Sequence, residues 1–397
     1  MWLGAAGLLA IAVLWLAWSL GGALLAPGTD PVDARVAEWA RSNGLGFVVG
    51  ALEQVQYQVD PPKVGGSVAG GIPSVAPLLS DAGQGGASGA PAASGSSPAS
   101  SGSASAGVAS PDPTASPDPT ASVTTAPDPI PPLVSPPLPR EGTWQTLDKL
   151  NGQPVLRAAF LRPDAQHTSY LAGVVWIDQS QVKLVLHPGY QLPGGSGWSQ
   201  ATQVLPAQRS SLLATFNSGF RLDDANGGWW ADGQAAVPLK AGAASMVFYK
   251  DGHVDIVKWG TAAPGPDVAA VRQNLVLLVD NGQVSPLVNS TTTLTWGKTL
   301  TGAFFVWRTA IGIRADGSLV FIVGPALSAG SLARIAQAAG AVRAMELDIN
   351  PAWTNFITYT HPSKAVAVPH MLTPDEQPNP YRYLQPSSRD FIAVMAR

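Results

Sequence analysis

Two acids and an amide alternate with apolar residues in the stretch from Ala341 to Asn350. Glu346, Asp348 and Asn350 occupy every second position, and the side chains of a strand alternate between its two faces. The pattern predicts a strand with one polar face, on which neighbouring groups lie roughly 6.5–7 Å apart. Carboxylates at that separation can divide acid–base work, one giving a proton while the other assists a nucleophile. A sheet face that meets water would show the same pattern, so both interpretations stay open here.

A helix and an earlier strand are expected to position these acids. Residues 318–323 form a β-prone run, and Ser331 to Ala339 has the apolar spacing of a helix, with Ser331 as its cap and Gly340 at its end. Strand, helix and strand in this order predict a crossover connection that leaves the acids at the carboxyl end of a strand. Ligand sites are common at that place.

Turn signals divide the rest of residues 141–397 into short β-prone runs. Asp251-Gly252, for example, separates residues 245–249 from residues 254–259, as in a hairpin. So many strands argue against a doubly wound fold. The predicted fold class is α+β: a large mixed, mostly antiparallel sheet with a few packed helices and one strand-helix-strand crossover.

Two glycine-containing stretches are candidate binding segments. Asn217 and Gly219 follow an apolar run, where an amide or free backbone N–H groups can meet a ligand, although an ordinary turn would use the same residues. Residues 226–233 read Asn-Gly-Gly-Trp-Trp-Ala-Asp-Gly. The tryptophans suit a sugar-stacking site or, more commonly, a buried core beside a hairpin turn.

Arg308 interrupts an apolar run, Phe304 to Gly312. A buried charge requires a partner, and the guanidinium fork matches phosphate or carboxylate. The partner is therefore either an anionic ligand or one of the acids Glu346 and Asp348, and one arginine can serve both purposes.

The composition excludes several classes of protein. The chain of 397 residues has a net charge of only −3 and no basic run, which argues against nucleic-acid binding. It contains no cysteine, so disulfides and cysteine-based zinc sites are excluded. Its five histidines lack metal-ligand spacing, and no cofactor is predicted. A divalent cation, Ca²⁺ or Mg²⁺, stays open as an alternative because Asp223 and Asp224 offer oxygen ligands.

The chain divides into four predicted parts. Residues 1–26 form a transmembrane anchor, because residues 2–26 are free of charge and long enough to cross a bilayer; a cleaved signal peptide is the rival interpretation. Residues 27–61 form a juxtamembrane helical segment. Residues 62–140 are rich in Pro, Ser, Ala and Gly and form a disordered linker. Residues 141–397 form the folded domain.

The juxtamembrane segment contains one predicted helix, from Pro31 to Arg41, with Asp30 as its cap. Val32, Val36 and Trp39 would form an apolar stripe on it. The stripe could dock on the downstream domain or on the membrane surface, or belong to a helix without such a role.

Taken in order, these blocks resemble the phosphodiester glycosidase family over roughly residues 141–397. The matches are Asn217-Ser-Gly-Phe220, Arg308-Thr-Ala-Ile-Gly312 with the Asp316-Gly317 turn, a helix, and Leu347-Asp348. The closing Ser388-Arg-Asp-Phe391 is also similar to that of bacterial relatives with a membrane anchor and a Pro-rich spacer. Each motif is weak alone, but the ordered set is fairly specific.

One departure from the family pattern follows Asp348. The family has glycines and a serine there, whereas this chain has Ile349-Asn-Pro-Ala-Trp-Thr354. Pro351 fixes its φ angle and removes a donor, and Ile349 lacks the freedom of glycine. The loop shape must therefore differ. We expect Trp353 to offer a new sugar platform and Thr354 to replace the serine, or else the loop marks a domain that binds without turnover.

The resemblance implies a membrane-anchored hydrolase of sugar-1-phosphodiester bonds in envelope glycans or glycolipids. Asp348 would be the principal acid or base, and Arg308 would hold the phosphate. Glu346 is not part of the family pattern; from its place beside Asp348 we expect it to raise the pKa of Asp348 or to activate water. The expected substrate-binding residues are Asn217, Gly219, Phe220, Asn350, Trp353 and Thr354. The alternative is a non-catalytic envelope module that binds anionic glycans. We expect a single-pass protein of the cell membrane with the C-terminal domain extracytoplasmic.

Overall fold

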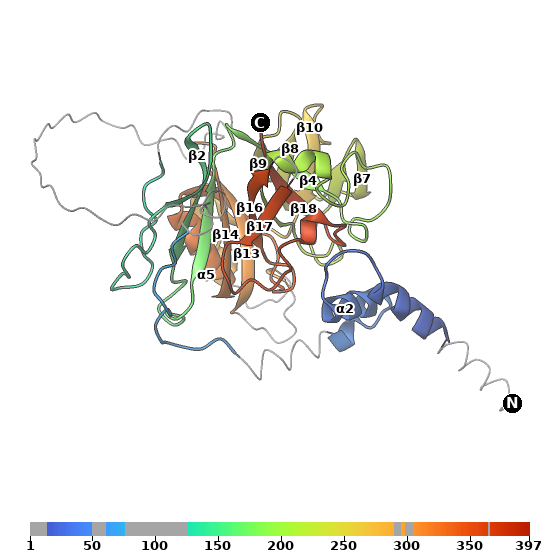
Figure 1. Ribbon diagram of the computed structural model, residues 1–397, viewed down its shortest axis with the longest axis horizontal. Coiled ribbons are helices and arrows are strands. Elements are labelled where there is room, and N and C mark those ends of the chain that lie inside the picture. The colour runs from blue at the N-terminus through green and yellow to red at the C-terminus, as the bar shows by residue number, and fades with distance from the viewer. Residues whose placement is uncertain (1–13, 50–60, 76–125, 290–294, 298–304, 364–365) are drawn as a thin grey trace, which may run out of the picture.

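The computed structural model describes residues 14–49, 61–75, 126–289, 295–297, 305–363 and 366–397. Three β-sheets form a strand-rich body, and the N-terminal helical segment stands out from it at the lower right of Figure 1.

The largest sheet has eight strands, and its neighbouring strands are antiparallel. Its central strands are buried along almost their whole length, because apolar layers cover both faces. In spatial order the strands are β1 (Gln145–Leu150), β2 (Gln153–Leu161), β3 (Ala172–Ile177), β14 (Leu319–Leu327), β13 (Val306–Arg314), β15 (Ala341–Glu346), β11 (Leu277–Asp280) and β12 (Gln283–Val284).

Two five-stranded sheets complete the body, again with antiparallel neighbours. The first has the order β7 (Gln234–Val237), β6 (Trp229–Ala231), β10 (Val268–Gln273), β8 (Ala244–Tyr249) and β9 (Val254–Lys258). The second has the order β17 (Val366–Met371), β16 (Phe356–Ser363), β5 (Leu212–Asn217), β18 (Phe391–Ala396) and β4 (Val182–His187). The hairpin predicted around Asp251-Gly252 is β8–β9.

The predicted strand-rich α+β class is confirmed, but the strands form three sheets rather than one. The expectation of a mixed sheet is wrong for the described ladders, which are all antiparallel. Only short isolated bridges near Gly189 and Leu192 are parallel. Antiparallel ladders suit the many short turns, since a parallel pair needs a longer crossover connection.

The predicted crossover is present and runs from β14 through α5 (Ala329–Ala338) to β15. Both strands pair antiparallel with β13, which lies between them, so β14 and β15 run in the same direction. The cap lies three residues earlier than predicted: Ser328, and not Ser331, caps the helix and accepts a hydrogen bond from the backbone N–H of Ser331 at 2.9 Å. It ends near Gly340, whose φ of +86° suits glycine.

Two apolar cores lie on opposite sides of the eight-stranded sheet. One joins this sheet to the two smaller sheets, where Phe216 and Phe321 have ring centroids 4.9 Å apart. The other lies beneath α5, which buries Leu332 and Ile335. Residues on both sides of segment 76–125 also pack here: Ile72 belongs to the first core and Ile130 to the second. Most of the predicted linker, residues 76–125, lies outside the described residues.

The N-terminal part contains α2 (Val32–Ser42), as predicted, and residues 14–24 are also helical. Within the described ranges, no helix is both long and apolar enough to cross a membrane. The predicted span over residues 2–26 lies half outside those ranges. Residues 46–49 are helical as well, and the described ranges also contain three short 3₁₀ helices: η1 (Pro206–Ser211), η2 (Pro286–Asn289) and η3 (Arg382–Leu384).

Candidate functional site

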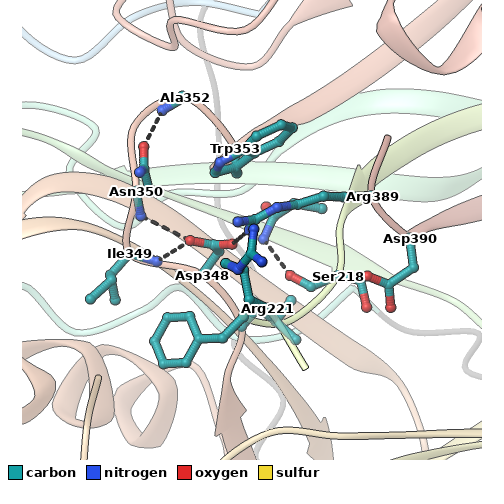
Figure 2. A network of polar contacts seen from close by, with 12 residues as sticks. Ser218, Arg221, Asp348, Ile349, Asn350, Ala352, Trp353, Arg389 and Asp390 are labelled. Atoms are coloured by element: carbon teal, nitrogen blue, oxygen red, sulfur yellow. Dashed lines mark hydrogen bonds and ion pairs between the residues drawn. The ribbon is translucent and has the colours of Figure 1, made fainter. Parts of the chain in front are cut away.

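The Asp348 carboxylate lies just beyond the end of β15 and is only 2% exposed. One of its oxygens accepts the backbone N–H groups of Ile349 at 2.7 Å and Asn350 at 2.9 Å. The other accepts Nη1 of Arg389 at 2.9 Å, as Figure 2 shows. Burial raises the pKa of Asp348, while Arg389 and the two N–H groups oppose the rise. The carboxylate is thus held in one orientation.

Thr309 fixes the backbone that carries this carboxylate. The Thr309 N–H donates to the carbonyl of Asp348 at 2.9 Å, and the Asp348 N–H donates to the Thr309 hydroxyl at 3.0 Å. β13 and β15 therefore stay joined beyond the last residue of β15. The predicted alternation also ends here: Leu347 packs in the first core, but Ile349 packs against the core under α5.

Arg389, which the sequence analysis did not select, comes from the turn before β18. Its guanidinium carbon lies 4.3 Å from the ring centroid of Trp353, and that of Arg382 lies 4.8 Å from the same ring. Trp353 is only 3% exposed. It is therefore a support for two arginines and not the open sugar platform that we expected. Arg389 lies two residues before β18, at an element end where charged residues are ordinary, so its only signal in the sequence was its place in the Ser388-Arg-Asp-Phe391 match.

Arg308 and Glu346 form a second, more deeply buried ion pair, with side chains 4% and 0% exposed. Arg308 also donates to the backbone carbonyls of Leu327 at 2.8 Å and Trp296 at 3.3 Å. Burial raises the pKa of Glu346, and the positive charge of Arg308 opposes the rise. Of the two partners considered for Arg308, the structure therefore shows the salt bridge to an acid of β15. Both predicted acids are paired, each with its own arginine.

Asn217, the last residue of β5, connects neighbouring segments of the site through the hydrogen bonds of its side chain. Its amide donates to the Thr309 hydroxyl at 2.9 Å, and its oxygen accepts the Asn355 N–H at 3.1 Å. The side chain thus connects β5 with β13 and with the loop that precedes β16. We predicted a residue that presents its amide to a ligand, and in this structure the amide is used in these internal contacts.

Gly219 leaves room for two neighbours. A Cβ atom there would lie 3.0 Å from the amide of Asn274 and 3.2 Å from the guanidinium of Arg272. Asn274 donates to the carbonyls of Glu346 and Leu347 at 2.9 and 3.0 Å. The glycine therefore matters because a neighbouring side chain approaches closely.

Phe220, the other predicted binding residue of this block, is 6% exposed and packs in the core under α5. Arg272 forms a nearby buried pair with Asp390 at 2.7 Å, and Trp229 donates to the same carboxylate at 3.2 Å. The pair fixes the residue that follows Arg389. Trp229 is 1% exposed, so the core interpretation of this tryptophan applies.

The loop after Asp348 is shaped by Asn350. Its side-chain oxygen accepts the Ala352 N–H at 2.9 Å, and its backbone carbonyl accepts the N–H groups of Trp353 and Thr354 at 2.9 and 3.0 Å. Thr354 is fully buried. The hydroxyls of Thr354 and Ser218 make no hydrogen bond to the described part of the chain.

The N-terminal segment reaches this site through acids that the sequence analysis did not select. One oxygen of Glu38 in α2 accepts Nη2 of Arg389 at 2.7 Å, and the other accepts Nη1 of Arg221. Asp30, expected to cap the helix, instead bonds to Arg382 at 3.1 Å and to Ser388. The helix packs with its Glu38 face against the domain.

The apolar stripe that we predicted on α2 does not form this contact. Val32 is 66% exposed and Val36 is 38% exposed, whereas Ala34 and Glu38 are buried. Charge pairing therefore orients the helix on the domain, and the two valines face away.

Asp223 and Asp224, the acids considered for a divalent cation, are both exposed. Over the described ranges, no group of three or more acids and histidines is arranged to hold a metal ion.

The arrangement suits the chemistry of an anionic substrate. Asp348 is a carboxylate of raised pKa in a fixed orientation, and Figure 2 shows Arg221 and Arg389 both directed toward it. Such a group can exchange a proton or approach a carbon centre, while buried guanidinium groups stabilise negative charge in a site with little water. The Arg308–Glu346 pair is more deeply buried than Arg221 and Arg389.

Comparisons with known proteins identify the family of this segment. No curated protein matches the chain. Among solved structures, the zebrafish N-acetylglucosamine-1-phosphodiester alpha-N-acetylglucosaminidase catalytic domain, described as auto-inhibited by its pro-peptide, is 15% identical with a TM-score of 0.40. The match covers 64% of this chain and 87% of that chain.

A hypothetical protein from Synechocystis is also 15% identical, with a TM-score of 0.34 and coverage of 63% of this chain and 65% of its own. The model of the phosphodiester glycosidase family matches residues 213–348. This segment begins in β5, ends on Asp348 and includes Asn217, Arg221 and Arg308. Residues 213–348 therefore belong to a domain of the phosphodiester glycosidase family.

Proposed function

We propose that this chain hydrolyses the bond between a sugar and a phosphodiester group, with Asp348 as the reacting carboxylate. The observation that carries the proposal is the position of Asp348: the last residue of the family match is a buried carboxylate held by Arg389, beside Arg221. These groups match the two needs of the reaction, a base and a site for negative charge.

The chemistry of the leaving group explains why one carboxylate can suffice. In the proposed step, the oxygen of water bonds to the anomeric carbon, the bond from that carbon to the bridging oxygen breaks, and a water proton passes to Asp348. The bonding electrons stay on the departing phosphate. A phosphate monoester has a second pKa near 6, so it leaves without a strong general acid. Stabilisation of its charge by guanidinium groups is then the main requirement.

Glu346 has a supporting role in this proposal. It is 0% exposed and paired with Arg308, so it is poorly placed to exchange protons with water. The negative charge of nearby Asp348 raises the pKa of Glu346 slightly further. We assign the Arg308–Glu346 pair to fixing β13 against β15, and not to the direct holding of phosphate that the sequence suggested.

We also propose that the substrate is an envelope glycan or glycolipid, with the protein anchored in the cell membrane and its folded domain outside the cytoplasm. This part is supported by the charge-free run over residues 2–26 and by the Ser/Pro-rich composition after it. It is independent of the proposed chemistry.

The test is the release of sugar from a panel of sugar-1-phosphodiesters by the full chain. Because Glu38 already bonds to Arg389 and Arg221, the panel is run with the natural chain and with Glu38→Ala. Asp348→Asn should lower release roughly a hundred- to ten-thousand-fold in either background. Asp267→Asn removes an exposed acid and is the matched control, for which we expect no change. Release by neither background would contradict the proposal.

One observation favours a non-catalytic alternative. Asp348 already accepts three hydrogen bonds and is only 2% exposed, so both of its oxygens are engaged and little of the carboxylate is open to an attacking water. The same arginines would then bind an anionic glycan without turnover. Background-level release by all variants, together with glycan binding that is lost in Arg389→Met, would support this binding module.

A further inference from the structure

A groove of about 500 Å³ lies on the sheet of β7, β6, β10, β8 and β9, which is at the upper right of Figure 1. Trp230 of β6, Trp259 directly after β9, Leu239 and the loop of residues 260–264 line it. Its volume is within the roughly 300–1,000 Å³ that small-molecule sites occupy. None of the lining residues belongs to the constellation around Asp348, so the groove is a separate feature of the domain.

The two tryptophans of the Asn226–Gly233 motif have different places in the fold. As neighbours in a strand, Trp229 and Trp230 point to opposite faces of the sheet. Trp229 lies opposite Arg272 in the ladder and is only 1% exposed. Trp230 lies opposite Val271, and the two pack in a small apolar cluster apart from the larger cores. Trp230 stays partly exposed there, so its indole ring is open to a ligand.

The wall of the groove is held in place by Gln273, the last residue of β10. Its side-chain oxygen accepts the backbone N–H groups of Gly228 at 2.8 Å and Lys240 at 2.7 Å, and its amide donates to the Lys240 carbonyl at 3.1 Å. A Cβ at Gly228 would lie 2.4 Å from the carbonyl oxygen of Pro238, so glycine is needed for this close approach. The groove is therefore shaped before any ligand arrives, as binding sites usually are.

The charges around the groove do not select an ion. Every lining residue is uncharged. The charged residues that flank the lining segments are two lysines and two aspartates: Lys240, Lys258, Asp232 and Asp267. The ammonium of Lys240 is bonded to the side-chain oxygen of Asn226 at 3.1 Å. A ligand without net charge therefore fits this surface best.

The two partly exposed tryptophans indicate the chemical class of that ligand. An indole ring offers a flat apolar face and one N–H donor. Among the described residues, no hydrogen bond uses the indole N–H of Trp230 or Trp259. A sugar ring has matching parts, since its C–H groups can lie on an aromatic face while its hydroxyls accept hydrogen bonds.

A proline-rich peptide is the rival ligand, because aromatic grooves also bind such segments. This chain contains one over residues 110–121, with two copies of Ser-Pro-Asp-Pro-Thr-Ala. Each copy carries an aspartate, for which the lining of the groove offers no cation. The sugar is therefore the better match.

We propose that this groove is a second binding site, which takes uncharged sugar units of a glycan on the rings of Trp230 and Trp259. The proposal goes beyond the proposed function and does not depend on it. Consecutive residues of β10 support the two sites, since Arg272 pairs with Asp390 beside Arg389 while Gln273 fixes the groove. A glycan held in the groove is thus retained near the acid, which raises its effective concentration there.

The test measures the binding of three neutral probes, maltohexaose, cellohexaose and chitohexaose, to the full chain by calorimetry. At least one should bind, and Trp230→Ala and Trp259→Ala should each raise its Kd at least about tenfold. Trp230→Phe keeps an aromatic face and should raise the Kd less than Trp230→Ala. Trp18→Ala removes a tryptophan that is 79% exposed on the N-terminal helix and should change nothing.

A variant that keeps both tryptophans guards against loss of folding. Ala235 is exposed on β7 and lies opposite Trp230 in the ladder, so Ala235→Glu places a charge in the groove and should abolish binding. Failure of all three probes to bind would overturn the proposal, as would unchanged affinity in Ala235→Glu. Tighter binding of anionic oligogalacturonate, or of a peptide of residues 110–121, than of any neutral probe would refute the ligand class. Sugar release is not measured here, so this proposal and the hydrolase proposal can each fail alone.

Discussion

The buried pair of Arg308 and Glu346 gives the sharpest test of how the site is built. In Arg308→Met the carboxylate of Glu346, which is 0% exposed, loses its ion-pair partner. Removing one partner of a buried pair costs roughly 3–5 kcal/mol, whereas replacing both with apolar groups is often neutral. Arg308→Met should therefore lose roughly 3–5 kcal/mol of unfolding free energy.

The double variant Arg308→Met/Glu346→Leu should recover much of this loss. The carbonyl of Leu327, which accepts from Arg308 at 2.8 Å, still lacks its donor, and an unsatisfied buried acceptor costs about 1–3 kcal/mol. We therefore expect a net loss of roughly 1–3 kcal/mol in the double variant. Glu346→Leu alone also breaks the pair and should cost roughly 3–5 kcal/mol, so the coupling energy between the two substitutions should be at least about 3 kcal/mol.

Urea unfolding followed by tryptophan fluorescence measures all four corners of this cycle. The same cycle on Arg314 and Asp316, a more exposed pair at 3.4 Å, is the control and should give a coupling energy below about 1 kcal/mol. A loss under about 1 kcal/mol in Arg308→Met, or a double variant no more stable than the single one, would refute the supporting role of the pair.

Three further predictions concern the fold around the site. Burial raises the pKa of Glu376 to about 8, so folding stability should fall as pH rises from about 5 to about 8. Glu376→Gln should remove roughly 4–5 kcal/mol of that fall in urea unfolding. Burial lowers the pKa of His187 to about 4. Folding stability should therefore fall by roughly 3 kcal/mol as pH drops from about 6.5 to about 4. His187→Gln should remove this dependence of the unfolding free energy on pH. Equal pH profiles for variant and natural chain would refute either assignment. Gly219→Ala pushes against Asn274 and should cost about 1–3 kcal/mol, whereas Gly260→Ala, which meets open space, should cost under about 0.5 kcal/mol.

The local part of the fold could be predicted because local patterns carry it. The apolar spacing of residues 331–339 and the strand that follows were sufficient to predict the crossover, and with it the place of Asp348. The division into three sheets was not predictable in this way, because strand partners such as β5 and β16 lie far apart in the sequence. Ser331 was a plausible cap, but Ser328 competes with it three residues earlier.

The candidate site was only half predictable for a related reason. Glu346, Asp348 and Arg308 could be recognised in the sequence because charged residues are unusual in an apolar strand. Arg221 and Arg389 lie at element ends, where charged residues are ordinary, and only the fold places them beside Asp348. The burial of Glu38 could not be predicted from the sequence, because an acid on a short helix is normally solvated. Glu38 is buried only because α2 packs against the turn that carries Arg389.

The same limit applies to residues whose role is positional. Thr309 and Asn274 hold the backbone of residues 346–348 through hydrogen bonds, and neither residue type is distinctive in sequence. Their contribution follows from strand register, since Ala310 lies opposite Glu346 in the ladder.

The central claim is that Asp348 directs water to the sugar carbon and not to phosphorus. Hydrolysis of a sugar-1-phosphodiester by Glu38→Ala in water labelled with heavy oxygen tests it directly, with the phosphate product analysed by mass spectrometry. We expect an unlabelled phosphate product, because every oxygen bonded to phosphorus is retained, and loss of the reaction in Asp348→Asn. Label in the phosphate, or an undiminished rate in Asp348→Asn, would contradict it.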